Sequence, residues 1–417
     1  MSLLNKSTLY NNIVSLSTLQ LANYIFPLIV IPYFVRTLGL YNYGIIAFIQ
    51  SLIAYFAILI NFGFNLSAVS DIAKINNQSE RISYFWKTIF SKVSLLIFCF
   101  ILLLVITNFE PFKANKTLYY IAFIMLIENC LFPVWYFQGI QKMKYIPIIQ
   151  ISIRTITTIM IFVFVKGQSD LNLAIAIPAF GNSLIGLTGF FYILSQIKFK
   201  FYLPKFIELT IHFKSSWSLF IGQVATTFFN DFLVLILGIF GSYSSVAIFV
   251  AADKIIKAVT ALIAPISWAI YPQSSIMFNK SKKIALLFLS KIYRYGVVIF
   301  AILAICLFTF SPQLAHIISG ARNDSIALLL KIMSLVPLSI FINNIYGTQI
   351  LINTGYRKLF TQALIIAAIY SIIVSIVLIP KYHEIGAGLV SLTTEILIAG
   401  LMKYYCDKNQ LKLLEYH

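Results

Sequence analysis

Apolar runs of about twenty residues follow one another along almost the whole chain, and this pattern limits the fold more than any other feature. Of the 417 residues, 60% are hydrophobic and only 11% are charged, whereas a soluble domain usually carries about 25% charged residues. A helix needs about 20 residues to cross the roughly 30 Å of bilayer hydrocarbon, and the runs lack the two-residue alternation of barrel strands. The chain is therefore predicted to be an all-α integral membrane protein.

Twelve membrane-spanning helices are predicted from these runs. They cover residues 11–34, 43–62, 86–107, 117–138, 146–166, 172–195, 216–240, 244–270, 291–311, 326–352, 359–380 and 384–405. The connecting segments are short, and no GxxxxGK[ST] phosphate loop occurs. We also find no paired catalytic carboxylates, no nucleophile beside a base and no metal-ligand cluster. The chain is thus predicted to be neither an enzyme nor a holder of a metal or cofactor.

The net charge of +18 would suit nucleic acid, but the cations fall in alternate loops, as expected for membrane topology. With the N-terminus inside, the cytoplasmic segments hold clusters such as Lys198, Lys200, Lys205 and Lys214, whereas the opposite loops hold Arg36, Lys113, Lys116, Lys166, Arg322 and Lys381. This bias predicts a multi-pass protein with both termini in the cytoplasm. Contact with membrane lipids is expected, and binding to nucleic acid is not.

Two six-helix lobes are predicted, covering residues 1–200 and 201–417. The polar segment from Lys198 to Lys214 separates six spans from six. Gly39 and Tyr41, between the first two spans, align with Gly241 and Tyr243 between spans seven and eight. These matches indicate a parallel repeat, which commonly places a substrate site between its halves near the bilayer midplane.

Three charges lie inside the eighth predicted span. Asp253 and Lys257 are four residues apart and share a helix face with Lys254. A charge near the bilayer centre costs about 2.5–3.5 kcal/mol on insertion scales. The trio therefore either lines a cavity that binds an anion, or forms a structural salt bridge with one lysine reaching toward the interface.

Arg154 lies deep in the fifth span, and a guanidinium suits bidentate phosphate binding. It either binds substrate or pairs with Glu128 of span four. Lys92, Arg294 and Lys331 lie nearer span ends, and anchoring at the membrane interface is the expected role for them.

Amides, hydroxyls and single carboxylates mark further faces of the predicted spans. A polar stripe on span seven comprises Gln223, Thr227, Asn230 and Asp231, and Asn23 repeats this pattern on span one. The stripe faces either a neighbouring helix or a wet lumen. Glu128, Glu395 and Asp231 are candidate coupling carboxylates, although a buried carboxyl can also act as a neutral hydrogen-bond donor. The four histidines are expected to be solvated.

Three segments resemble the signatures of a known family. They are PLIVIPYFVRTLGLYNYG (Pro27–Gly44), NFGFNLSAVSDIAK (Asn61–Lys74) and FPVWYFQGIQKMKYI (Phe132–Ile146). With the AADKI segment (Ala251–Ile255), they are similar to bacterial O-antigen and polysaccharide flippases of the Wzx type, within the multidrug/oligosaccharidyl-lipid/polysaccharide exporter superfamily. The chain departs from the family pattern at Ser70, Gln141 and Asp253, where the family often has Arg, Glu and Glu.

The resemblance implies two six-helix lobes around a central cavity, as in MATE transporters, in the bacterial inner membrane. The implied cargo is an oligosaccharide repeat unit on undecaprenyl diphosphate, with the polysaccharide polymerase and chain-length machinery as partners. Lys254, Lys257, Arg154 and Arg36 are the candidate cations for the diphosphate. One alternative is a multidrug or cation antiporter of the same superfamily. Another is a membrane-embedded polymerase or ligase, which the short outer loops disfavour.

Overall fold

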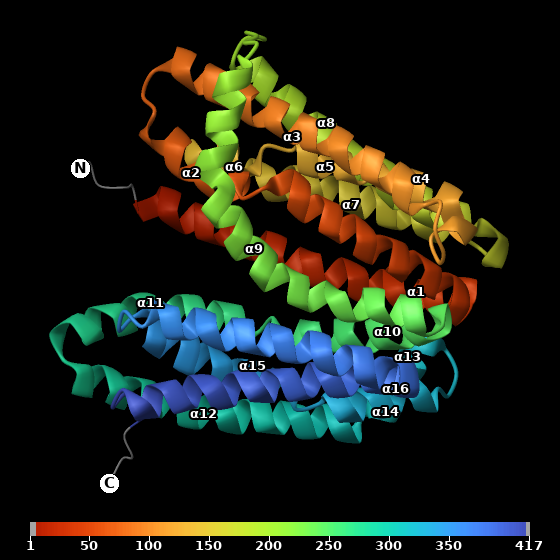
Figure 1. Cartoon of the computed structure of the whole chain (residues 1–417), viewed down its shortest axis with the longest axis vertical. Coiled ribbons are helices and arrows are strands. Elements are labelled where there is room, and N and C mark those ends of the chain that lie inside the picture. Colours follow the sequence, from red (N-terminus) through yellow and green to blue (C-terminus); the bar gives the residue numbers. More distant parts are fainter. Residues whose placement is uncertain (1–5, 414–417) are drawn as a thin grey trace. The chain divides into compact units, whose positions relative to one another are not determined.

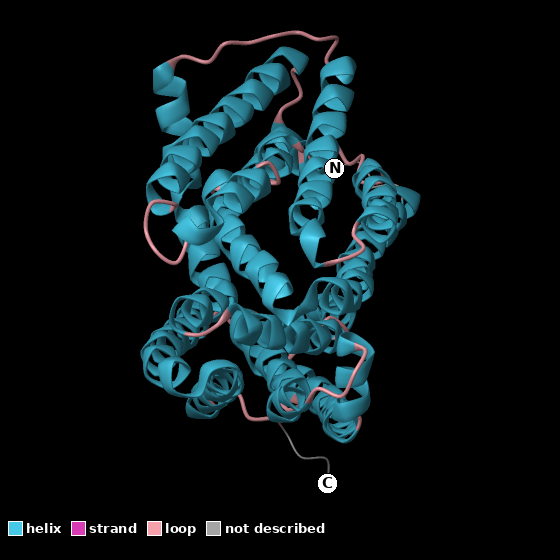
Figure 2. Ribbon diagram, turned by 90° about the vertical axis from the view of Figure 1, so that its right-hand side faces the viewer, coloured by secondary structure: helices cyan, strands magenta, loops and turns pink. Residues whose placement is uncertain are grey.

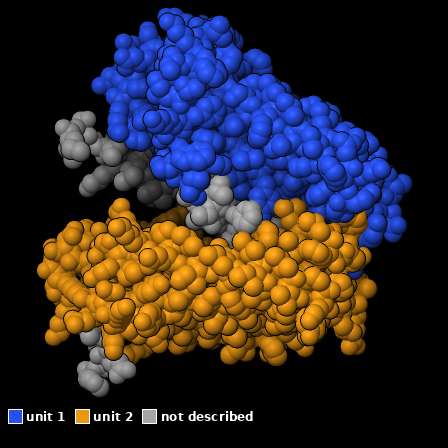
Figure 3. All heavy atoms as spheres, viewed as in Figure 1, with its two compact units in different colours: residues 1–231 blue, residues 232–417 orange. Residues whose placement is uncertain are grey.

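The computed structural model describes residues 6–413, except for the side chains of residues 6–13, 16 and 222–231. Within that range every regular element is a helix (Figure 2). The chain divides into two compact units, residues 1–231 and 232–417, which Figure 3 shows in different colours. The expected lobe boundary at residues 200/201 stays a prediction.

Unit 1 contains the helices that precede residue 232 (Figure 1). They are α1 (Lys6–Asn61), α2 (Phe64–Lys74), α3 (Gln78–Ile106), η1 (Lys113–Asn115), α4 (Lys116–Phe123), α5 (Leu126–Leu131), α6 (Val134–Gly139), α7 (Tyr145–Phe164), η2 (Gln168–Asp170), α8 (Leu171–Gln196) and most of α9 (Phe206–Phe240). Helix α7 packs on α1 and α8, and α5 packs on α1, α3 and α8. These contacts bring the predicted spans one, four, five and six together.

Unit 2 contains the remaining helices. They are the end of α9, α10 (Tyr243–Thr260), α11 (Ile263–Lys280), α12 (Lys282–Thr309), α13 (Ser311–Ser319), α14 (Asp324–Met333), α15 (Val336–Asn343), η3 (Asn344–Ile352) and α16 (Arg357–Lys408). Helix α10 packs on α14, α15 and α16, whereas α12 packs on α11 and α15.

Two helices are long enough to hold two spans each. Helix α1 has 56 residues, which would extend about 84 Å if straight, far beyond the roughly 30 Å of hydrocarbon. It is interrupted at Gly39, where φ is 81° and ψ is 165°, a conformation that glycine adopts readily. The 52-residue α16 is interrupted in the same way at His383, where φ is 47°. Each helix is therefore a pair of spans joined without a loop.

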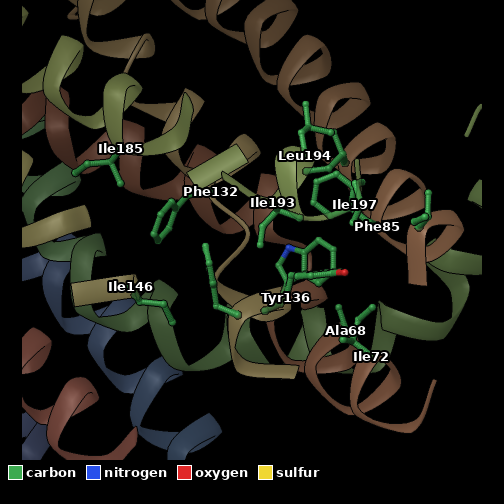
Figure 4. Packing of buried hydrophobic residues seen from close by; sticks show 14 residues of the cluster. Ala68, Ile72, Phe85, Phe132, Tyr136, Ile146, Ile185, Ile193, Leu194 and Ile197 are labelled. Carbon is green, nitrogen blue, oxygen red and sulfur yellow. The ribbon is translucent and has the colours of Figure 1, made fainter. Parts of the chain in front are cut away.

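The core of unit 1 lies where α2, α3, α6 and α8 meet (Figure 4). Phe85, Trp135 and Phe137 are fully buried there. Close approach of α6 to α2 depends on Gly139, because a Cβ at this position would lie 2.6 Å from Cγ2 of Ile72. Dense packing of this kind holds the unit 1 helices in fixed register.

The first part of α9 packs against α2 and α3 within unit 1. His212 is only 6% exposed, and its ring stacks on Phe64 at 4.7 Å between ring centroids. Its Nε2 atom lies 3.1 Å from the Thr88 hydroxyl on α3. The expectation that the histidines are solvated is therefore wrong for His212, because α2 and α3 cover its ring.

An ion pair adds to this attachment of α9. Lys87 Nζ on α3 lies 2.8 Å from Glu208 Oε1. This hydrogen bond, with those from the Lys205 backbone and the Tyr202 hydroxyl, holds the pKa of the Glu208 carboxyl at about 2. The connector between the predicted lobes thus carries specific contacts to unit 1.

In unit 2, the tenth predicted span contains a π-helix, η3. A buried hydrogen-bond chain links it to α11. Gln349 accepts a bond of 3.0 Å from Ser274 and donates one of 3.0 Å to the hydroxyl of Ser267. Asn353 donates a further bond of 2.9 Å to Ser274. Polar contacts between spans therefore fix this irregular segment, as is usual where helix geometry changes within a membrane.

Candidate functional site

Arg154 is the centre of a polar cluster inside unit 1. It lies on α7, and its guanidinium Nη1 donates a hydrogen bond to the Asn23 side chain on α1. The other terminal nitrogen, Nη2, lies 3.8 Å from Glu128 Oε1 on α5. One side chain thus contacts two other spans. The pairing with Glu128 that the sequence suggested is present.

Glu128 is held from two sides. Gln150, one turn before Arg154 on α7, donates to its Oε1 atom at 3.3 Å. Behind it, α8 approaches closely at Gly186, where an added Cβ would lie 2.9 Å from the Glu128 Cα atom. Gln150 was not among the sequence-predicted site residues. Its spacing of four from Arg154, which places both on one helix face, was the available signal.

The cluster keeps part of the guanidinium accessible. The Arg154 side chain is 27% exposed and that of Glu128 is 14% exposed. A guanidinium has five N–H donors in a rigid fork, and Asn23 and Glu128 engage the two terminal nitrogens. The carboxylate compensates part of the charge, so that a cation is kept in place inside a membrane-spanning unit.

The charged trio of the eighth span lies on α10, in unit 2. Lys257 Nζ pairs with Asp253 Oδ2 at 2.8 Å, one turn apart. The Asp253 side chain is 14% exposed and that of Lys257 is 36% exposed, and Lys254 is half-buried. The salt bridge that the sequence offered as one interpretation is present.

Glu395 on α16 contacts α15. Asn343 donates its side-chain amide to Glu395 Oε2 at 2.6 Å. The carboxyl is therefore hydrogen-bonded between two spans of unit 2. A role for Glu395 in coupling stays a prediction, as it does for Glu128.

Five predicted site residues remain, namely Arg36 and the polar stripe of span seven. Arg36 is exposed on α1, three residues before the interruption at Gly39. The side chains of Gln223, Thr227, Asn230 and Asp231 lie outside the described residues. The structure thus brings together Arg154, Glu128 and Asn23 in unit 1, and Asp253 and Lys257 in unit 2.

The position of Lys92 differs from the one expected. Lys92 was expected to anchor at the membrane interface, yet it is only 1% exposed. Its ammonium donates to the side-chain oxygens of Asn61 and Asn65 and to the backbone oxygen of Asn129, each at 3.1 Å. Asn61 ends α1 and Asn65 lies in α2, so their spacing in the sequence does not place them on one helix face, and only the packing of these helices reveals this site.

The fold is shared with solved membrane transporters. One is "Lipid II flippase MurJ, inward closed conformation", with a TM-score of 0.74 and 15% identity over 95% of this chain and 87% of that one. Another is an inward-facing multidrug resistance MATE family transporter of the MOP superfamily, with a TM-score of 0.63 and 12% identity over 93% of this chain and 99% of that one. The predicted all-helical, two-lobe membrane fold with twelve spans is thereby confirmed.

The sequence itself defines the family. Residues 9–278 match the family described as "Polysaccharide biosynthesis protein". Over 416 residues the chain is 31% identical to the "Putative O-antigen transporter" of Escherichia coli (strain K12), covering 98% of this chain and 99% of that protein. The chain belongs to this family of polysaccharide biosynthesis proteins, and the resemblance noted in its sequence motifs is confirmed.

Proposed function

We propose that this protein flips undecaprenyl-diphosphate-linked oligosaccharide repeat units across the bacterial inner membrane. The observation that carries the proposal is the placement of Arg154, a partly exposed guanidinium held inside the membrane-spanning fold by Asn23 and Glu128. A diphosphate loses its hydration on entering a membrane protein, and a guanidinium fork replaces that water with matched donors. The relative described as "Putative O-antigen transporter" supports the same cargo class.

Further groups would hold the two ends of this cargo. Lys254 and Lys257 on α10 supply more positive charge for the diphosphate. The stripe from Gln223 to Asp231 supplies amides and hydroxyls that suit sugar hydroxyl groups. The two lobes would alternate in their opening to each side of the membrane, the usual mechanism for repeats of this kind.

The membrane potential would assist this direction of movement. A diphosphate carries about two negative charges, and an inside-negative potential of ~100 mV favours their outward movement by up to about 4–5 kcal/mol. The gain is smaller if protein cations move with the cargo. Both termini would lie in the cytoplasm, and the polymerase and chain-length machinery would receive the flipped unit.

The test is complementation of a strain that lacks its own flippase. Surface polysaccharide is measured by gel for Arg154→Ala, Lys254→Ala and Lys257→Ala, with membrane levels of each protein matched. Lys283→Ala, which removes an exposed cation at the start of α12, is the control. We expect loss of display in the three variants and normal display in the control. Normal display in all three would refute the role of these cations.

A second measurement separates this function from drug export. Cells that express the protein are assayed for efflux of cationic dyes. Dye efflux without any effect on surface polysaccharide would replace the proposed function with that of a multidrug antiporter.

A further inference from the structure

A pocket in unit 2 lies away from the candidate site residues. Its volume is about 520 Å³, and helices α12, η3 and α16 surround it. The lining combines charged, aromatic and apolar side chains, namely Ser290, Tyr293, Arg294, Val297, Val298, Tyr346, Lys403, Asp407, Lys412 and Leu413. Neither Asp253, Lys254 nor Lys257 lines it, so it is distinct from the charged face of α10.

The charge of this pocket is positive. Arg294, Lys403 and Lys412 contribute three positive charges, and Asp407 contributes one negative charge, which leaves two positive charges. Among the residues with described side chains, none of the three cations has an ion pair or a side-chain hydrogen bond. Cations gathered at one pocket without a partner in the protein favour an anionic ligand.

The pocket has a polar part and an apolar part. Ser290 is 7% exposed, and its hydroxyl has no hydrogen-bond partner among the described residues. Val298, two turns further along α12, is 53% exposed. A buried hydroxyl without a partner beside an exposed apolar surface suits a ligand that has both a polar head and a hydrocarbon chain.

The position of the pocket fits a membrane surface. Lys282, which begins α12, donates to the backbone oxygen of Asn409 at 3.5 Å, so the start of α12 and the end of α16 lie at the same end of unit 2. Figure 1 shows these two ends side by side near the C-terminus. Basic residues gather here, as they do on the cytoplasmic side of membrane proteins.

We propose that this pocket binds the phosphate headgroup of an anionic phospholipid from the cytoplasmic leaflet. Arg294, Lys403 and Lys412 surround the phosphate, and the acyl chain extends over the valines of α12. Pockets of basic residues between spans on the cytoplasmic side are known to bind anionic headgroups in other proteins. The proposal does not depend on the cargo, because it concerns a lipid that stays with the protein.

The test uses the purified full-length protein in neutral detergent. Phosphatidylglycerol is titrated while thermal unfolding is followed, and bound lipid is counted by native mass spectrometry. Each of the substitutions Arg294→Gln, Lys403→Gln and Lys412→Gln is expected to weaken binding about fivefold, and the triple variant roughly a hundredfold. Lys408→Gln is the matched control, because Lys408 is exposed on the same helix end but does not line the pocket.

Two comparisons show which ligand is bound. Phosphatidylethanolamine, which has no net charge, should stabilise the protein far less than phosphatidylglycerol. Inorganic phosphate that stabilises the protein as well as the lipid does, with the same loss in the triple variant, would overturn the assignment to a lipid.

The variants themselves provide the decisive outcomes. Unchanged binding of phosphatidylglycerol by a triple variant that unfolds normally without lipid would overturn the proposal. If the triple variant does not fold, the single variants decide it. Asp407→Asn is expected to bind the lipid several-fold more tightly, because it removes the one negative charge of the lining.

Discussion

The guanidinium of Arg154 lies 3.8 Å from the carboxylate of Glu128 on a neighbouring span. Because the same guanidinium also donates to Asn23, it ties three predicted spans of unit 1 together. We predict that Arg154→Lys keeps the charge but lowers polysaccharide display about tenfold, since an ammonium cannot reach both partners as a planar fork does. The measurement is gel analysis of surface polysaccharide at equal protein level.

A conservative change elsewhere is the control for this variant. Arg357→Lys alters an exposed arginine at the start of α16 and should leave display unchanged. Full display by Arg154→Lys would mean that positive charge alone suffices at this position, and that the geometry of the fork is unimportant.

Substitutions of Asp253 and Lys257, which form a salt bridge, are expected to have different effects on polysaccharide display. Asp253→Asn should lower the free energy of unfolding by only about 0.5 kcal/mol, as for other pairs one turn apart, and should preserve display because it makes α10 more positive. Lys257→Gln should reduce display. Equal losses of display at equal protein level in the two variants would indicate that the pair, and not the positive charge, is what matters.

The buried ammonium of Lys92 is predicted to be structural. Lys92→Met would remove the donor to the Asn65 side-chain oxygen and the Asn129 backbone oxygen, at about 1–3 kcal/mol for each acceptor left unpaired. The Asn61 oxygen would keep its hydrogen bond of 3.2 Å from Asn65. Thermal unfolding in detergent should therefore occur at clearly lower temperature. Lys87→Met on the same helix is the comparison, because its ion pair with Glu208 is partly exposed and such pairs contribute little. Equal unfolding temperatures for the two variants would contradict the prediction.

The burial of the His212 imidazole predicts that the protein loses stability in acid. His212 lies ahead of the predicted span at residues 216–240, and burial lowers the pKa of its imidazole from 6.5 to about 4, while nearby Asp71 opposes and Lys87 reinforces this shift. Between pH 6.5 and 4 the unfolded chain binds a proton that the folded protein does not. Stability should therefore fall as the pH drops through this window, by at most roughly 3 kcal/mol.

The measurement is the unfolding temperature as a function of pH. His212→Gln can keep a hydrogen bond to Thr88 but does not titrate, so it should lose this part of the pH dependence. His316→Gln, at an exposed histidine of α13, should retain it. An identical pH profile for wild type and His212→Gln would show that other groups cause the acid sensitivity.

Contacts within one helix can be predicted from the sequence, whereas contacts between helices cannot. The pairing of Asp253 with Lys257 follows from a four-residue spacing, which local geometry determines. The span pattern follows from hydropathy and bilayer thickness. The prediction that Lys92 anchors at the membrane interface is wrong, because its distance from the span end does not show which residues surround it. The asparagines that hold it come from α1, α2 and α5, and only tertiary packing brings these helices together.

The interruption of α1 at Gly39 has a mechanical consequence. Span one and span two are joined by a single residue, so no slack separates their motions. Asn23, which holds Arg154, and Asn61, which holds Lys92, belong to this one continuous helix pair. If a ligand drew Arg154 away from Asn23, span one could shift. Span two, which carries Asn61, would then be expected to shift with it, because no flexible segment separates the two spans.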